Sequence, residues 1–113
     1  MAIIKTVNWK RNNKSQEQIM FEIERYCNAL NCIYKNLVIT DDVITFTAYS
    51  KITYEELVNK LVREKYTDSD EFAILRKAIN SITDEYLIYN AYVEECKVRA
   101  KAFVEERESV VNG

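Results

Sequence analysis

Apolar residues recur at intervals of three and four in four segments of this chain, which is the pattern of amphipathic helices. The first helix is predicted to begin after Ser15, with Gln18 as its capping-box partner, and to end at Asn31. Thr53 and Glu56 form a second capping box, which predicts another helix that ends near residue 66.

Two more helices are expected in the second half of the chain. Asp68 and Glu71 are predicted to cap the third helix, and Thr83 opens the fourth, which runs to about residue 108. Some 25 residues at a rise of 1.5 Å per residue give this last helix a length of about 40 Å.

Alternating apolar and polar positions predict three strands, at residues 3–9, 32–40 and 43–50. Asp41 and Asp42 form a short turn between the second and third strands, so this pair is predicted to be a hairpin. Strict alternation would place apolar side chains on one face of each hairpin strand. These side chains are Ile33, Leu37 and Ile39 in the first strand, and Ile44, Phe46 and Ala48 in the second.

The predicted element order is β-α-β-β-α-α-α, which indicates an α+β fold. We expect a small three-stranded, mainly antiparallel sheet packed by helices, followed by a helical half with a long C-terminal helix. The 113 residues fit one domain, with a β-α-β-β part at residues 1–50 and a helical part at residues 51–113.

The last helix has a coiled-coil-like repeat on one face and charged residues around the rest. This face either packs on the preceding helices of the same chain or binds a partner, and the turns beyond Lys101 are expected to outrun the shorter helices. Tyrosine, with eight copies, favours a binding surface, because it is enriched in protein interfaces. The candidate partner-binding residues are Tyr86, Tyr89, Tyr92, Val93, Ala100 and Phe103.

The chain contains no histidine and no proline, and its single glycine is Gly113. Without histidine it cannot build the usual Ser-His-Asp or Cys-His nucleophile. Without an internal glycine it has none of the glycine loops that approach phosphate closely. We therefore expect a protein that is not an enzyme, with no catalytic residue and no cofactor.

Cysteines and carboxylates give no further candidate chemistry. Three cysteines, Cys27, Cys32 and Cys96, make an odd number, which argues against a disulfide framework. Because no histidine accompanies them, we interpret them as buried reduced thiols and expect no metal site. The acidic residues around Asp41 and around Asp68 are interpreted as turn and helix-cap residues.

The formal net charge of −2 gives no overall attraction to nucleic acid. Locally, however, Trp9, Lys10, Arg11 and Lys14 combine an aromatic ring with three cations. Such a mixture can stack a base and hold phosphates. The other interpretation is a solvated loop in which Trp9 anchors the first strand in the core.

Hydropathy predicts no membrane-spanning helix, because no stretch approaches about 20 apolar residues. The N-terminal residues 1–5 are too short for the apolar region of a signal peptide. We therefore expect a protein that is not secreted by a signal peptide.

Three segments of the C-terminal half, REKYT (63–67), EFAILRK (71–77) and YNAYVEECK (89–97), resemble a helical hairpin in small proteins from bacteriophage structural gene modules. Those hairpins often have a proline-bearing turn, whereas the link here, residues 80–83, has none. The resemblance implies a phage origin, a location in the host cytoplasm or the virion, and a role in assembly or host interaction. It identifies no catalytic residue.

Together these features predict a non-enzymatic phage protein that acts by protein–protein interaction, as a virion component or assembly factor. Its partner would be a second copy or another phage or host protein. One alternative is an inhibitor of a host defence or transcription protein. Another is a small nucleic-acid-binding protein that uses the basic loop near the N-terminus.

Overall fold

The computed structural model describes residues 3–109 and confirms the predicted order of elements and the α+β class. The elements are β1 (Ile4–Lys10), α1 (Gln16–Leu30), β2 (Cys32–Ile39), β3 (Val43–Ser50), α2 (Tyr54–Arg63), α3 (Asp68–Ala78) and α4 (Asp84–Glu108). The first strand is one residue longer than predicted at its C-terminal end, because Lys10 pairs with Val43. Within the described residues, no helix is both long enough and apolar enough to cross a membrane.

The chain divides into two compact units. We call residues 3–52 the sheet unit and Thr53–Ser109 the helical unit. This division lies close to residue 50, where the sequence predicts the change from the β-α-β-β part to the helical part. The expectation that both parts belong to one domain stays a prediction.

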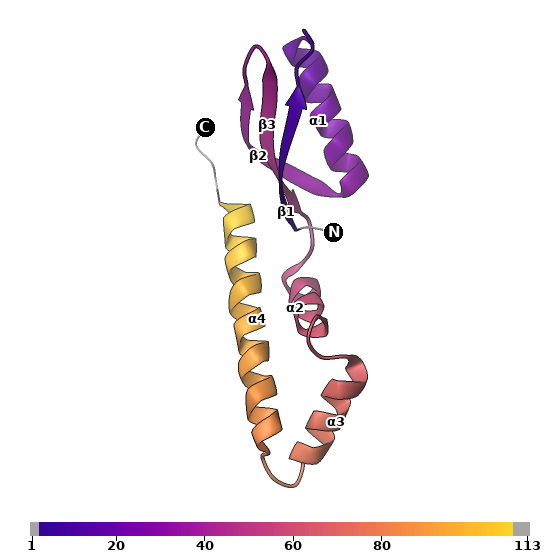
Figure 1. Ribbon diagram of the computed structural model, residues 1–113, viewed down its shortest axis with the longest axis vertical. Helices are drawn as coiled ribbons and strands as arrows, with labels where there is room; N and C mark the ends of the chain where they lie inside the picture. The colour runs from indigo at the N-terminus through magenta and orange to yellow at the C-terminus, as the bar shows by residue number, and fades with distance from the viewer. Residues whose placement is uncertain (1–2, 110–113) are drawn as a thin grey trace. The chain divides into compact units, whose positions relative to one another are not determined.

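The sheet unit is a three-stranded antiparallel sheet with one helix against it (Figure 1). β3 lies in the centre and pairs with β1 on one side and with β2 on the other. Side chains from α1 and from all three strands form one core. Its buried members are Val7, Ile19, Ile23, Cys27, Cys32, Ile44, Phe46 and Ala48.

Both predicted ends of α1 are confirmed. The Ser15 hydroxyl accepts a hydrogen bond from the backbone N–H of Gln18, at 3.2 Å, which is one half of the predicted capping box. At the other end, Asn31 adopts a left-handed conformation (φ 52°), and its N–H donates to the carbonyl of Cys27. This asparagine takes the place that glycine usually occupies after a helix.

A β-bulge in β2 corrects the predicted faces of the hairpin. The pairing with β3 shifts by one residue between Lys35 and Val38, and Asn36 within this interval has a positive φ of 58°. One extra residue reverses the alternation of side chains. Leu37 and Ile39 therefore pack against the core, as predicted, but Ile33 does not share their face, and Cys32 is buried in its place.

In the helical unit, α2 and α3 both pack against α4 (Figure 1). Thr53 and Glu56 form the predicted capping box, and Thr83 accepts from the N–H of Tyr86 at the start of α4. The cap of α3 differs from the prediction. It is Thr67, which forms a box with Asp70, because a threonine hydroxyl one residue earlier can reach the free N–H groups of the first turn.

The helical unit buries eight side chains: Leu57, Leu61, Val62, Ile74, Tyr89, Cys96, Ala100 and Phe103. Phe103 is only 5% exposed. Phe103 is thus buried, although the turns beyond Lys101 were expected to outrun the shorter helices.

The left-handed residue in the β2 bulge gives a test of the fold. Replacing Asn36 by alanine should lower the free energy of unfolding by about 1 kcal/mol. The Cβ of alanine disfavours positive φ, and alanine lacks the amide with which asparagine can form a compensating local hydrogen bond. Replacing it by glycine should cost less, because glycine adopts this conformation without a steric penalty. Urea unfolding of both variants measures the difference. An alanine variant as stable as the glycine variant would contradict the bulge geometry.

Candidate functional site

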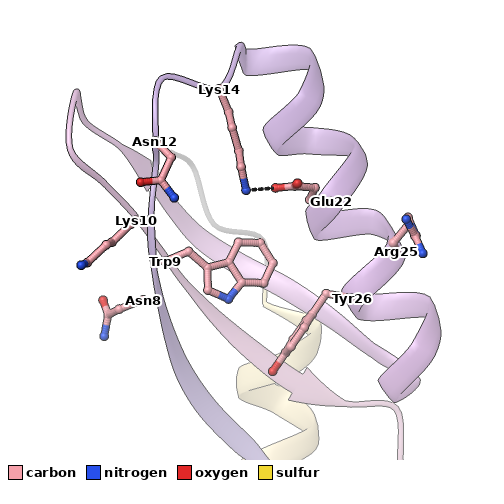
Figure 2. A pocket seen from close by; sticks show the side chains of 8 residues that line it. All are labelled: Asn8, Trp9, Lys10, Asn12, Lys14, Glu22, Arg25 and Tyr26. Atoms are coloured by element: carbon pink, nitrogen blue, oxygen red, sulfur yellow. Dashed lines mark hydrogen bonds and ion pairs between the residues drawn. The ribbon is translucent and has the colours of Figure 1, made fainter.

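The sheet unit has an open cleft of about 670 Å³ along β1 and α1 (Figure 2). Its lining combines two aromatic rings, three cations, two amides and one acid. These residues are Asn8, Trp9, Lys10, Asn12, Lys14, Glu22, Arg25 and Tyr26. Three of the four residues of the predicted basic site, Trp9, Lys10 and Lys14, thus come together in one place.

Trp9 is the aromatic centre of the cleft. The centroid of its ring lies 5.4 Å from the ring centroid of Tyr26 and 5.1 Å from that of Phe46, and both pairs are edge to face. Trp9 is half-buried and packs against the core of the sheet unit, so it anchors β1 as one of the two interpretations predicted. The remaining part of the indole lines the cleft, where Figure 2 shows it between Asn12 and Tyr26.

The three cations of the cleft differ in the partners that they contact. The Lys14 ammonium forms a 2.8 Å ion pair with Glu22 of α1, so much of its charge is neutralised. Arg25 lies over the ring of Phe21, 5.8 Å from its centroid, and stands at the α1 rim of the cleft (Figure 2). Lys10 is exposed and has no ion pair with the described residues. Two cations are therefore available to an anionic ligand.

Arg11 does not line the cleft, which differs from the prediction that grouped it with Lys10 and Lys14. Its guanidinium donates to the carbonyls of Lys14 and Thr40, each at 3.1 Å. Its backbone N–H donates to the carbonyl of Asp42. Arg11 therefore fastens the β1–α1 loop to the β2–β3 turn.

Two asparagines shape the loop that brings β1 and α1 together. Asn12 and Asn13 both have left-handed backbones, with φ of 52° and 62°. Such residues reverse the chain in a short space. They allow the helix that starts after Ser15 to run back along the strand, which places Glu22 and Tyr26 beside Trp9.

Sequence reasoning missed the contribution of α1 to this cleft. Tyr26 of α1 packs against the core of the sheet unit and also lines the cleft. Arg25 and Glu22 gave no separate signal, because charged residues are ordinary on the outer side of a helix. Their approach to β1 depends on how the helix lies on the sheet, which the periodicity does not specify.

Three tyrosines of the helical unit, Tyr66, Tyr89 and Tyr92, contact one another. Tyr66 lies edge to face with Tyr89, at 5.2 Å between ring centroids, and 5.7 Å from Tyr92. The Tyr92 hydroxyl donates to the carbonyl of Leu61 at 2.9 Å, which joins α4 to α2. The Tyr89 hydroxyl donates to Glu71 of α3.

An arginine completes this cluster. Arg63 of α2 contacts Glu71 at 2.9 Å and Asp68 at 2.7 Å, and it donates to the carbonyl of Tyr66 at 3.3 Å. Glu71 therefore accepts from Arg63 on α2 and from Tyr89 on α4. This network ties the three helices together, so these side chains have a structural role in the helical unit.

The predicted partner-binding residues fall into two groups. Tyr89, Ala100 and Phe103 are buried, so they offer little surface to another molecule. The other three, Tyr86, Tyr92 and Val93, are half-buried, and Val93 lines a second cavity of about 380 Å³ in the helical unit.

Six of the eight large exposed apolar residues of the helical unit lie on α3, the α3–α4 loop and the start of α4, and the other two are Tyr54 and Val98. We call the set of six the α3–α4 apolar surface. It consists of Phe72, Leu75, Ile79, Ile82, Leu87 and Ile88.

All three cysteines are buried and free, as the sequence analysis predicted. Burial and a hydrogen bond with the Cys32 thiol raise the pKa of Cys27 to about 12. Among residues 3–109, no group of three histidine, cysteine or acidic side chains is placed to hold a metal ion.

No protein-family model, curated protein or solved structure matches this chain. The interpretation of its surfaces therefore depends on their own geometry and chemistry.

Acidification should destabilise the helical unit through Glu71. Hydrogen bonds from Arg63 and Tyr89 lower the pKa of Glu71 below its ordinary value of 4.5. The resulting stabilisation is fully present above pH 4.5 and is lost as the pH falls through the folded-state pKa. Unfolding in urea, measured from about pH 6 to about pH 3, should show a steeper loss of stability for the wild type than for Glu71→Gln.

A matched variant tests the assignment to this carboxylate. Glu24→Gln, on the exposed side of α1, should keep the pH dependence of the wild type. The assignment fails if Glu71→Gln and the wild type lose stability in parallel.

The native thiols should resist alkylation. The thiolate is the reactive species, and both burial and the raised pKa keep Cys27 protonated near neutral pH. A thiol reagent at about pH 8 should modify the folded protein at least about 100-fold more slowly than the protein in denaturant. Ala102→Cys introduces an exposed thiol on α4 that should react quickly in the folded state. Rapid labelling of the wild-type protein in native buffer would contradict the burial.

Proposed function

We propose that this is a non-enzymatic interaction protein that self-associates through the α3–α4 apolar surface. In the phage context that the C-terminal resemblance implies, it would be a virion component or assembly factor built from copies of one chain. The observation that carries the proposal is the exposure of six large apolar side chains within residues 72–88.

The exposed large apolar side chains of α3 and of its C-cap residue lie in a single row. Phe72, Leu75 and Ile79 are separated by three and four residues, so they lie on one face of the helix. Phe72 is 67% exposed and Ile79 is 77% exposed. Within α3 only Ile74 is buried, on a different face of the helix. The outward row therefore contributes little to the fold of the helical unit.

The area of this surface fits a protein interface. Taking about 150–200 Å² for a fully exposed apolar side chain, Phe72, Leu75 and Ile79 together expose roughly 300 Å². Monomeric proteins rarely expose contiguous apolar surface larger than a few hundred Å². A standard interface buries about 800 Å² on each partner, so these residues and a polar rim would supply one side.

The distribution of charge on α3 favours a second copy of the chain as the partner. Acidic residues occupy its first turn, Asp68, Asp70 and Glu71, and basic residues its last, Arg76 and Lys77. Two such helices that pair antiparallel would place the acidic end of each beside the basic end of the other. The helix dipoles would also oppose each other favourably.

An apolar-to-charged substitution on this surface tests the proposal. The wild-type chain should show a concentration-dependent shift from monomer to dimer in sedimentation velocity or light scattering. Phe72→Asp should weaken the dimer at least about 10-fold, because central aromatic residues contribute most of the interface energy. Its stability should be unaffected, since this ring is largely exposed.

Phe21→Asp is the matched control. Phe21 is 60% exposed on α1 in the sheet unit, so this substitution makes the same chemical change away from the proposed interface. It should leave the dimer intact. A wild-type chain that stays monomeric up to about 0.5 mM would exclude self-association, since even a dimer worth ~4 kcal/mol would begin to form there.

A further inference from the structure

The cleft of the sheet unit has aromatic side chains at its centre and cations at its rims. Trp9 and Tyr26 lie between Lys10, on the β1 side, and Arg25, on the α1 side (Figure 2). Lys10 and Asn8 alternate with Trp9 along β1 and so stand on the other side of the strand. Because β1 is an edge strand of the sheet, side chains from both of its sides can line one cleft at that edge.

The sheet unit also differs in charge from the rest of the chain. Up to Ile52 the sequence has seven lysines and arginines against five acidic residues. From Thr53 onward it has nine against thirteen. The net negative charge of the whole chain therefore comes from the helical part, and the cleft lies in the part that is net positive. An anionic ligand would meet a favourable local field there.

The polar groups of the cleft match the parts of a nucleotide. The indole and phenol rings offer faces or edges for a base, and such stacking tolerates every base. The Asn12 amide offers both a donor and an acceptor to a base edge or sugar. Lys10 and Arg25 supply positive charge for phosphates on either side of the aromatic centre.

The size and openness of the cleft favour a single strand over a duplex. A volume of about 670 Å³ accommodates one base and its sugar. The cleft is also open along the edge of the sheet. Bases in a duplex are paired and stacked with one another, so they cannot reach a tryptophan at the bottom of a cleft. Bases of a single strand can turn outward and stack on it.

We propose that the cleft between β1 and α1 binds single-stranded nucleic acid, with a base on Trp9 and with Lys10 and Arg25 contacting the flanking phosphates. A free nucleotide has the same base and phosphate chemistry. It would use only one of the two cationic rims at a time, so a strand that spans both rims should bind more tightly.

Trp9 gives a direct measurement, because it is the only tryptophan of the chain. An oligothymidylate of about 12 nucleotides, within the usual range of single-strand site sizes, should quench its fluorescence at low salt. A log–log plot of the binding constant against salt concentration should have a slope near −1.4, at about −0.7 for each of two phosphate contacts. The mononucleotide should bind at least about 10-fold more weakly, with a smaller salt slope.

Two lysine variants separate the cleft from general attraction to positive charge. Lys10→Gln should weaken binding of the oligonucleotide several-fold and reduce the salt slope by about 0.7. Lys35→Gln removes one charge from β2, the other edge strand of the sheet, where the ammonium lies 5.8 Å from the Tyr49 ring centroid. It should change binding much less. Lys10 is exposed and forms no ion pair with the described residues, so its variant should fold normally.

Two tryptophan variants test stacking. A fluorescently labelled oligonucleotide reports their binding by anisotropy, since they lack the intrinsic reporter. Trp9→Phe should retain most of the affinity, whereas Trp9→Leu should lose about 10-fold, the scale of one base–aromatic stack. Circular dichroism checks that both variants keep the fold, because Trp9 also packs against Phe46.

Several results would overturn the proposal. They are no binding at low salt, equal binding of a duplex of the same length, and equal loss of affinity in Lys10→Gln and Lys35→Gln. A polyphosphate that competes as well as the oligonucleotide would show a charge effect without base recognition. A mononucleotide that binds as tightly as the strand would identify the cleft as a site for free nucleotides and would reject a strand-binding role. None of the expected results requires the protein to self-associate, so the self-association proposal can fail independently.

Discussion

A chain without proline and without internal glycine must make its sharp backbone changes with other residues, and this one uses asparagine. Among residues 3–109, every non-glycine residue with positive φ is an asparagine: Asn12, Asn13, Asn31 and Asn36. Asparagine tolerates the left-handed region better than most residues with a Cβ. All four lie in the sheet unit, where they turn the chain between β1 and α1, end α1 and produce the bulge in β2. The cleft beside Trp9 exists because the first of these turns brings α1 back along β1.

The sequence was sufficient for features that depend on neighbouring residues. Ser15, Thr53 and Thr83 predict helix starts because a hydroxyl acts on N–H groups two or three residues away. The bulge at Asn36 could not be predicted, since a positive φ on asparagine is one of several conformations that residue adopts. Because of this bulge, Ile33 does not lie on the core face that strict alternation predicts for it. The cleft was found only in part: Lys10 and Lys14 are neighbours in sequence, but Arg25 joins them through tertiary packing.

The tyrosines show why interface composition is a weak guide to an interface. Tyr89 and Tyr92 have the residue type that binding surfaces favour, yet their hydroxyls bond to Glu71 and to the Leu61 carbonyl of the same chain. A tyrosine has an apolar ring and a polar hydroxyl, so it is as well suited to the junction of three helices in one chain as to an interface between two proteins. The exposure of a side chain distinguishes packing within the chain from availability to a partner. By that criterion the apolar row of α3, which has no such partners, is the better candidate for an interface.

The two proposed surfaces are in different units and differ in chemistry, so each can act without compromising the other. An anionic strand gains nothing from the apolar row on α3, and the acidic helical part repels it. The cationic rims of the cleft, Lys10 and Arg25, match the apolar row of a second copy poorly. If both surfaces act, the dimer carries two clefts. A strand long enough to reach both would then bind more tightly than one cleft allows, because its second contact is intramolecular. Self-association would in this way convert a modest single-strand site into one that distinguishes long strands from short ones.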